Sequence, residues 1–127
     1  MSDEANRELV LRYFECINSE DWVGLRDVWH EEIEIRAVGA RPRHGRDDAV
    51  ALYPRLFQAW PTHRDEPTRI VVAGDVVTAE VTFTGTMADG RQLSFDAVDV
   101  IDIADGRIRR LTNWYDVAYV RDQLAAG

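Results

Sequence analysis

One acidic residue interrupts an otherwise apolar face of a predicted strand. Asp99 alternates with Phe95, Ala97, Ile101 and Ile103, so a period of two places its carboxyl group in an apolar row. Burial of an unpaired carboxylate is costly, which favours the protonated form and raises the pKa of the group. We therefore expect Asp99 to serve as a neutral acid, unless a bulge shifts the register or a structural hydrogen bond occupies the side chain.

Two tyrosines lie on helix faces that are expected to point into the core. Tyr13 and Tyr53 each occupy a position in an apolar stripe with helical spacing. A phenol whose hydroxyl reaches a cavity donates a hydrogen bond to a carbonyl or enolate oxygen. The alternative is a packed ring with its hydroxyl at the rim. Asn113, on the last predicted strand, can orient a carbonyl group but cannot act as a base, and we expect it to line the same pocket.

Aromatic side chains are numerous enough to hold a flat, largely apolar ligand. The predicted substrate contacts are Trp29, Phe57, Trp60, Phe83 and Phe95, with Trp114 as a further aromatic. Core packing is the alternative explanation for most of them.

A basic loop is a further candidate for substrate contact. His44 lies there with Arg41, Arg43 and Arg46. The loop either forms a mouth that attracts a substrate carboxylate or phosphate, or it is a solvated loop paired with acidic residues, and the second interpretation is favoured. His63 is a candidate for a second base at the same mouth.

The composition excludes several kinds of chemistry. All 15 basic residues of the 127-residue chain are arginine, against 23 acidic ones, for a formal net charge of −8. The absence of lysine excludes Schiff-base chemistry, and an acidic domain is a poor ligand for nucleic acid. The single cysteine, Cys16, excludes an intrachain disulfide and a thiolate zinc site, and the histidines lack metal-ligand spacing. We expect no metal and no cofactor.

The hydropathy pattern contains neither a signal peptide nor a membrane span. The first residues are polar and acidic, and no apolar run approaches the length of a transmembrane helix. We expect a cytoplasmic protein whose partner is a small apolar organic ligand rather than a membrane or a nucleic acid.

Helical periodicity dominates the first half of the chain. Apolar stripes predict helices over about 3–17, 22–29 and 47–60, with Asp47 or Asp48 capping the third and Pro61 ending it. A short strand is predicted over 32–36, and Asp116 to Leu124 is predicted to close the chain as a short helix.

The second half alternates with a period of two. Strands are predicted over 69–72, 76–84, 91–103 and 107–115, separated by Gly74-Asp75, Asp89-Gly90 and Asp105-Gly106 turns. Strands segregated from helices predict an α+β fold in a single domain over 1–127, with three helices covering one face of a curved antiparallel sheet. A cone-like hollow between helices and sheet is the expected ligand site.

Several stretches carry a resemblance to a known family. They are Arg12-Tyr13-Phe14, Val38-Gly39, His44-Gly45-Arg46, Ala51-Leu52-Tyr53, Gly74-Asp75, Phe95-Asp96-Ala97-Val98-Asp99 and Asp105-Gly106-Arg107-Ile108. In this order they resemble the SnoaL-like branch of the nuclear transport factor 2-like superfamily over about the whole chain. The resemblance implies a cone-shaped α+β fold, often a homodimer joined through the open face of the sheet. The superfamily includes ketosteroid isomerases, polyketide cyclases, limonene epoxide hydrolases, dehydratases and binding modules.

The resemblance to ketosteroid isomerases also implies roles for individual residues. Their two tyrosines match Tyr13 and Tyr53, and their neutral oxyanion-binding aspartate matches Asp99. Their general-base aspartate falls at Ala37, and alanine cannot move a proton. The polyketide cyclases have a histidine near Asp99 and an acid/base aspartate near Asn113.

Limonene epoxide hydrolases match less well at their catalytic groups. Their arginine and first aspartate fall near Glu80 and Thr82, and their second aspartate falls at Asn113.

Three functional hypotheses follow. The first is a cofactor-independent acid–base enzyme of the cyclase or isomerase type, with Asp99, Tyr13 and Tyr53 as catalytic groups acting on an apolar, carbonyl-bearing molecule such as a polyketide. The second is a non-catalytic ligand-binding or dimerisation module, because Ala37 and Asn113 replace titratable groups. The third is an epoxide hydrolase or dehydratase that uses Asp99 with a histidine.

Overall fold

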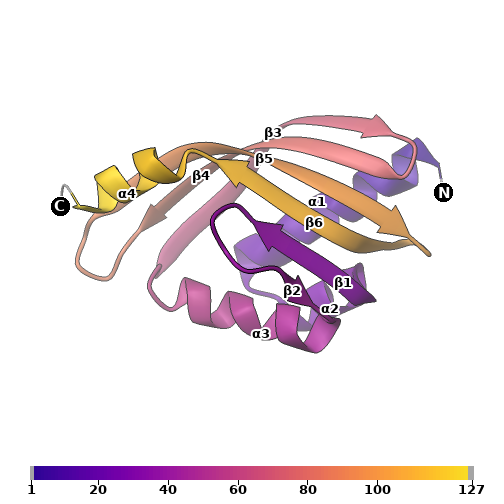
Figure 1. The fold of residues 1–127 in the computed structure, drawn as a ribbon, viewed down its shortest axis with the longest axis horizontal. Helices are drawn as coiled ribbons and strands as arrows, with labels where there is room; N and C mark the ends of the chain where they lie inside the picture. Colours follow the sequence, from indigo (N-terminus) through magenta and orange to yellow (C-terminus); the bar gives the residue numbers. More distant parts are fainter. Residues whose placement is uncertain (1, 126–127) are drawn as a thin grey trace.

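The computed structural model describes residues 2–125 as four helices and one six-stranded sheet (Figure 1). Residues 1, 126 and 127, the ends of the predicted domain over 1–127, lie outside the described residues. The helices are α1 (Asp3–Ser19), α2 (Trp22–Val28), α3 (Arg46–Phe57) and α4 (Val117–Ala125). The strands are β1 (Trp29–Ala37), β2 (Arg43–His44), β3 (Thr62–Ala73), β4 (Val76–Thr86), β5 (Gln92–Ala104) and β6 (Arg107–Tyr115). None of the described helices is long and apolar enough to cross a bilayer.

The sheet has the order β2-β1-β6-β5-β4-β3. Strands β3 to β6 form the predicted antiparallel meander, and glycines with positive φ at positions 74, 90 and 106 occupy its turns. The one difference from a purely antiparallel sheet is β1, which pairs in parallel with β6. Because that pairing joins segments more than 70 residues apart, no turn motif in the sequence predicts it.

Several boundaries differ from the predictions, and β1 begins at Trp29 instead of about residue 32. Strand β3 begins at Thr62 instead of about residue 69, because residues 62–67 pair with β4 despite their polar composition. Helix α3 ends at Phe57, so Trp60 lies in the following turn. Its N-cap is Gly45, without a side-chain cap, and the aspartates predicted to cap it lie in its first turn instead.

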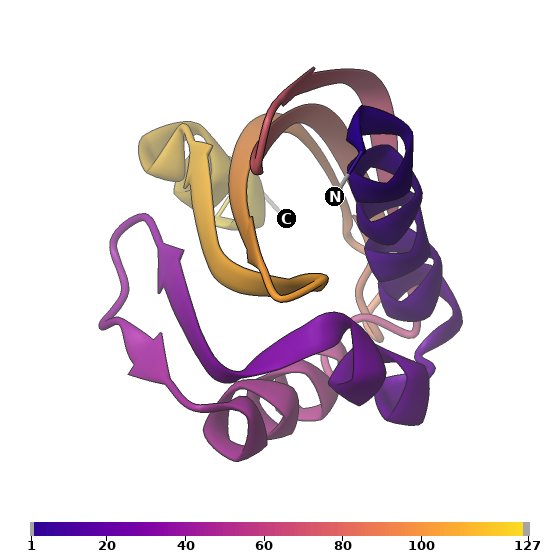
Figure 2. The same ribbon diagram turned by 90° about the vertical axis from the view of Figure 1, so that its right-hand side faces the viewer.

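The sheet is curled and unclosed, and helices line its concave side (Figure 2). Helix α1 begins after Ser2, whose hydroxyl accepts a hydrogen bond from the Ala5 N–H, and it packs against β3. Its predicted stripe is buried: Val10, Tyr13, Phe14 and Ile17. Helix α3 packs against β1, so each of these helices presents one tyrosine to the interior of the curl. The predicted α+β class with a curved, helix-covered sheet is thereby confirmed.

Candidate functional site

The interior of the curl contains a cavity of about 780 Å³. Its walls come from α1, α3, α4, strands β1 and β3 to β6, and the segment that joins β1 to α3. Most of the lining is apolar and includes Leu52, Leu56, Val81, Leu93, Ala97 and Leu111. Against this surface stand a few polar groups, which is the usual composition of a small-molecule site.

Asp99 projects into this cavity from the middle of β5, as its alternation with apolar residues predicts. The residue is only 6% exposed. Burial raises the pKa of the carboxyl group to about 7, although a hydrogen bond from Asn113 acts in the opposite direction. Asp99 is therefore mostly protonated below pH 7 and about half protonated at pH 7.

Asn113 lies beside Asp99 on the neighbouring strand. Its Nδ2 donates a hydrogen bond to Asp99 Oδ1 at 2.6 Å, and the two residues are register partners of β5 and β6. Ala37 is in turn the partner of Asn113 on β1. Ala37, which the resemblance to ketosteroid isomerases matches to their general base, lines the cavity with a methyl group only.

The two tyrosines meet at the helix side of the cavity. Tyr13 from α1 and Tyr53 from α3 both line it, and their hydroxyl oxygens are 3.3 Å apart. Burial raises the pKa of both phenols, and the neighbouring charge of Asp99 adds to the increase. Both therefore stay protonated, as hydrogen-bond donors must.

Trp29 lies behind the tyrosines and does not line the cavity. Its ring centroid is 6.3 Å from that of Tyr13 and 5.3 Å from that of Tyr53, and the residue is fully buried. As the first residue of β1, it supports the two phenols from the core. The structure therefore gives Trp29 no direct access to the cavity.

The other predicted aromatic contacts do lie on the cavity wall. They are Phe57, Trp60, Phe83 and Phe95. The Trp60 ring meets Phe83 edge-on at 5.6 Å, and Phe83 lies 5.1 Å from Phe95. These rings form one aromatic end of the cavity, whereas the exposed side chain of Trp114 belongs to the other face of the sheet.

The basic loop lies at the entrance, but His44 is not part of the wall. Arg41 and Arg43 line the cavity, and Arg43 forms an ion pair of 3.5 Å with Asp48. His44 is exposed on the short strand β2. An arginine-lined entrance therefore exists, with one of its guanidinium groups already paired.

A second carboxyl group on the cavity wall escaped the sequence analysis. Asp65 lies on β3, and burial raises its pKa to about 6 even though the nearby His63 acts to lower it. The polar composition of residues 62–67 does not predict a strand, so the sequence does not indicate that Asp65 points inward. In the structure the segment alternates, with His63, Asp65 and Pro67 of intermediate exposure and Arg64 and Glu66 exposed, but no apolar alternation in the sequence indicates it.

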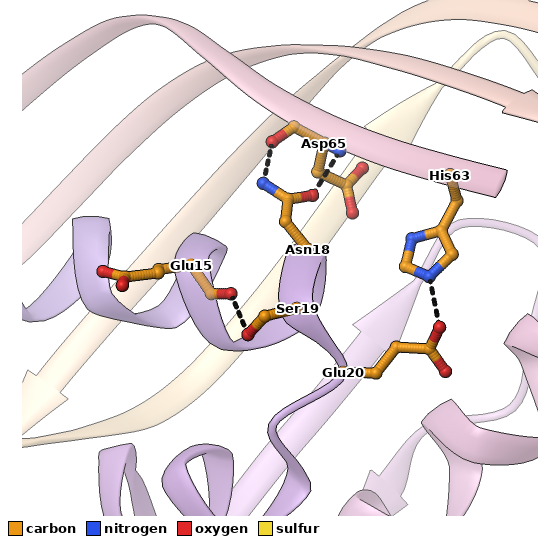
Figure 3. A network of polar contacts seen from close by, with 6 residues as sticks. All are labelled: Glu15, Asn18, Ser19, Glu20, His63 and Asp65. Atoms are coloured by element: carbon orange, nitrogen blue, oxygen red, sulfur yellow. Dashed lines mark hydrogen bonds and ion pairs between the residues drawn. The ribbon is translucent and has the colours of Figure 1, made fainter.

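Asn18 of α1 binds both backbone polar groups of Asp65 on the free side of β3 (Figure 3). The Asp65 N–H donates to Asn18 Oδ1 at 2.7 Å, and Asn18 Nδ2 donates to the Asp65 carbonyl oxygen at 2.9 Å. Because β3 is the edge strand, these backbone groups have no strand partner on that side. The Asn18 amide takes the place of such a strand and fixes the direction of the Asp65 side chain.

His63 lies next to Asp65 on the same face of β3 (Figure 3). Its ring stacks on Phe57 with centroids 3.9 Å apart, and its Nε2 is 3.2 Å from Glu20 Oε2. The side chain is only 3% exposed, and it is not on the cavity wall. His63 therefore has a packing role beside the site, in contrast to the base at the mouth that the sequence suggested.

The arrangement can support proton transfer to and from an organic molecule. One carboxylic acid and two phenols can donate hydrogen bonds to a developing oxyanion, and a second carboxyl group faces the same space. Within residues 2–125, no cluster of three or more histidine, cysteine or acidic side chains is placed to bind a metal ion.

Comparisons with solved structures show how widespread this architecture is. A protein from Jannaschia assigned as a SnoaL-like polyketide cyclase superimposes with a TM-score of 0.89 at 20% identity, covering 98% of this chain and 94% of that one. A limonene-epoxide-hydrolase-like epoxide hydrolase from M. tuberculosis gives 0.85 at 20% identity, covering 98% and 92%. TerC, crystallised with polyporic acid, gives 0.85 at 17% identity, covering 95% and 98%. At such identities the likeness establishes the fold and no activity.

No protein with curated annotation matches the sequence significantly. The sequence model of the SnoaL-like domain, in contrast, matches residues 10–111. This range includes Tyr13, Tyr53, Asp65 and Asp99 and covers most of the chain. The protein therefore belongs to the SnoaL-like domain family.

Proposed function

We propose that this protein is a cofactor-independent acid–base enzyme of the cyclase or isomerase type. Its substrate is an apolar, carbonyl-bearing small molecule such as a polyketide. The observation that carries the proposal is the buried Asp99 carboxyl group, which shares one apolar cavity with the hydrogen-bonded Tyr13 and Tyr53 hydroxyls. Buried carboxyl groups with raised pKa values in a cavity are candidate catalytic acids.

The proposed roles follow from the donor set. The substrate carbonyl oxygen accepts hydrogen bonds from Asp99 and the tyrosine pair, which stabilise the negative charge that develops on that oxygen. Most of the cavity lining is apolar, so these donors act in a medium of lower dielectric constant than water. Asn113 holds Asp99, and the aromatic end of the cavity binds the substrate ring.

The size and lining of the cavity support this substrate class. A volume of about 780 Å³ is within the usual range for small-molecule sites, about 300–1,000 Å³. Phe57, Trp60, Phe83 and Phe95 offer flat surfaces to a polycyclic ligand. The arginines at the entrance add a preference for a substrate that carries a negative group at one end.

An epoxide hydrolase or dehydratase is the second candidate. The observation that favours it is that Asp65 and Asp99 both face the cavity, since one can activate water while the other protonates the leaving oxygen. The M. tuberculosis epoxide hydrolase with the same fold supports the comparison at the level of architecture.

We also propose that the chain forms a homodimer through the open face of its sheet and works in the cytoplasm. The exposed Trp114, 54% accessible on the face away from the cavity, supports the dimer. The lone, buried thiol of Cys16 is compatible with a reducing compartment. Sedimentation of the native protein and of Trp114→Arg tests the dimer, since only the variant is expected to be monomeric.

Proton exchange in heavy water tests the proposed activity. β-Tetralone, a flat aromatic ketone with acidic α-hydrogens, and a panel of aromatic polyketide ketones serve as probes, and proton NMR follows the loss of the α-hydrogen signal. We expect exchange with the native protein, a large loss with Asp99→Asn, and native rates with Asp96→Asn, an exposed carboxylate on the opposite face of β5. Exchange retained in full by Asp99→Asn, or binding of ketones without any exchange, contradicts the proposal. Hydrolysis confined to a parallel panel of epoxides supports the second candidate instead.

A further inference from the structure

We infer that Asp65 is the general base that removes the α-hydrogen of the ketone. This assignment rests on the proposed function and specifies its substrate as an enolisable ketone. It also resolves the difficulty left by Ala37, because a carboxylate from a different strand faces the same cavity.

The position of Asp65 is suited to a flat substrate. Its register partner on β4 is Phe83, whose partner on β5 is Phe95, so the three side chains form one row across the sheet. All three line the cavity. A ring seated on Phe83 and Phe95 therefore lies beside the Asp65 carboxylate.

The Asp65 carboxylate is free to react. Within residues 2–125 it makes no hydrogen bond or ion pair, whereas both backbone polar groups of Asp65 are bound by the Asn18 amide. A general base requires a backbone that is held in place and a carboxylate oxygen that is free to accept a proton. Asn18 and Tyr13 are both on α1, so one helix sets the base relative to an oxyanion donor.

Charged and titratable groups from four elements face Asp65. They are His63 of β3, Tyr13 of α1, Tyr53 of α3 and Asp99 of β5, and the neighbouring strand β4 presents the uncharged Phe83. The negative charge of Asp65 raises the pKa of Asp99, of Tyr13 and of Tyr53. An ionised Asp65 therefore adds to the effect of burial, which is the main cause of the raised pKa values of the three donors.

The two carboxyl groups have pKa values that suit different roles. That of Asp65 is about 6 and that of Asp99 is about 7. As the pH rises, Asp65 loses its proton first, and the resulting charge helps Asp99 to keep its own. One member of the pair is then a base while the other is an acid.

The proton-transfer step balances without a further reactant. An Asp65 Oδ atom accepts the α-proton, and the C–H electron pair becomes the new carbon–carbon π bond. The carbonyl π pair moves to the oxygen, which is held by the donors of Asp99, Tyr13 and Tyr53. In heavy water, the protonated Asp65 exchanges its proton for a deuteron from the solvent, and delivery of that deuteron to the same carbon gives exchange. Delivery to a conjugated carbon gives isomerisation, and attack of the enolate carbon on a second carbonyl gives cyclisation.

Exchange of β-tetralone in heavy water, measured across pH, tests this role. Asp65→Asn is expected to lower the exchange rate by about 10²–10⁴-fold and to abolish the rise of kcat/KM that accompanies ionisation of the base. Asp65→Glu, which keeps a carboxylate, is expected to retain that rise at a reduced rate. The matched control is Glu66→Gln, which removes a charge one residue away on the exposed face of β3.

The outcomes separate this inference from the proposed function. Exchange by Asp65→Asn at the native rate overturns the assignment of the base and leaves the proposed function in place. Absence of exchange with the native protein overturns both. Binding of β-tetralone, measured by quenching of tryptophan fluorescence, is expected to be unchanged in Asp65→Asn. If Asp65→Asn loses this binding while Glu66→Gln keeps it, the purely catalytic role of Asp65 is contradicted.

Discussion

Asn113 Nδ2 donates a hydrogen bond of 2.6 Å to Asp99 Oδ1 across the β5–β6 pair. Because an amide nitrogen only donates, Oδ1 is the acceptor and the acidic proton of Asp99 lies on Oδ2. The carboxyl group thus has one oxygen committed to the protein and one O–H left for the substrate. Burial raises the pKa of Asp99, and this bond keeps the increase from going further.

Removal of that bond is predicted to raise the pKa of Asp99. Asn113→Leu keeps the approximate volume but lacks the donor, so the ionised form of Asp99 loses its main stabilising partner. We expect the fall in activity on the alkaline side of the pH profile to move to higher pH. Thr112→Val is the control, because the Thr112 hydroxyl, next to Asn113 on β6, donates to the Val100 carbonyl oxygen of β5 and does not line the cavity. An alkaline limb that stays in place in Asn113→Leu contradicts this account of the bond.

The stability of the protein is predicted to fall as the pH rises. The Asp99 carboxyl group has a pKa of about 7 in the folded state against 3.8 in the unfolded chain. The folded state therefore binds more protons between those values, and its free energy of unfolding decreases as the pH rises through that window. Urea unfolding of the native protein at about pH 5.5 and about pH 8 should differ by on the order of 2 kcal/mol from this group.

Asp99→Asn is expected to reduce that dependence on pH. The buried amide has no proton to lose, so the variant gains stability relative to the native protein at the higher pH while its activity is lost. Asp65 contributes in the same direction over a narrower range, because its folded pKa is about 6. Equal pH slopes of unfolding free energy in the native protein and in Asp99→Asn would show that Asp99 ionises normally.

The two tyrosines are predicted to act as one unit. Removal of one oxyanion donor by Tyr13→Phe or by Tyr53→Phe should lower kcat by on the order of 10²-fold. Because the two hydroxyls are 3.3 Å apart, the double variant should cost less than the product of the single losses. Tyr119→Phe, at an exposed position of α4, is the control. Strictly multiplicative losses would argue against a shared role.

Gly85 is predicted to set the width of the aromatic end. A Cβ atom at this position would lie 2.9 Å from Trp60 Cε3 and 3.0 Å from Phe83 Cζ. Gly85→Ala must displace the Trp60 ring, which should destabilise the fold by about 1–3 kcal/mol and weaken binding of β-tetralone. Thr84→Val changes an exposed residue on the opposite face of β4 and should leave binding unaltered. Unchanged affinity in Gly85→Ala would exclude Trp60 from the binding surface.

The sequence predicted those site residues that lie in a regular strand or helix pattern. The alternation around Asp99 and the helical stripes of Tyr13 and Tyr53 place all three side chains toward the interior, as the structure has them. The hydrogen bond between the two phenols joins residues 40 positions apart. Such a contact depends on how α1 and α3 pack and leaves no trace in either local pattern.

Three positions show where sequence reasoning was insufficient. Asp65 was missed because its neighbours are charged or proline, and only pairing with β4 makes the segment a strand. Trp29 continues the apolar stripe of α2 but begins β1, where it packs behind the tyrosines. His44 shares a loop with arginines that reach the entrance, yet its own side chain is exposed and away from the wall.

Site-resolved titration of the carboxyl groups by carbon-13 NMR tests the central claim most directly. In the native protein the Asp99 resonance should titrate with a pKa of about 7, and in Asp65→Asn this pKa should decrease because the neighbouring negative charge is gone. A pKa of Asp99 near 4, the ordinary value for an aspartate, would contradict the buried neutral acid on which the proposed chemistry depends.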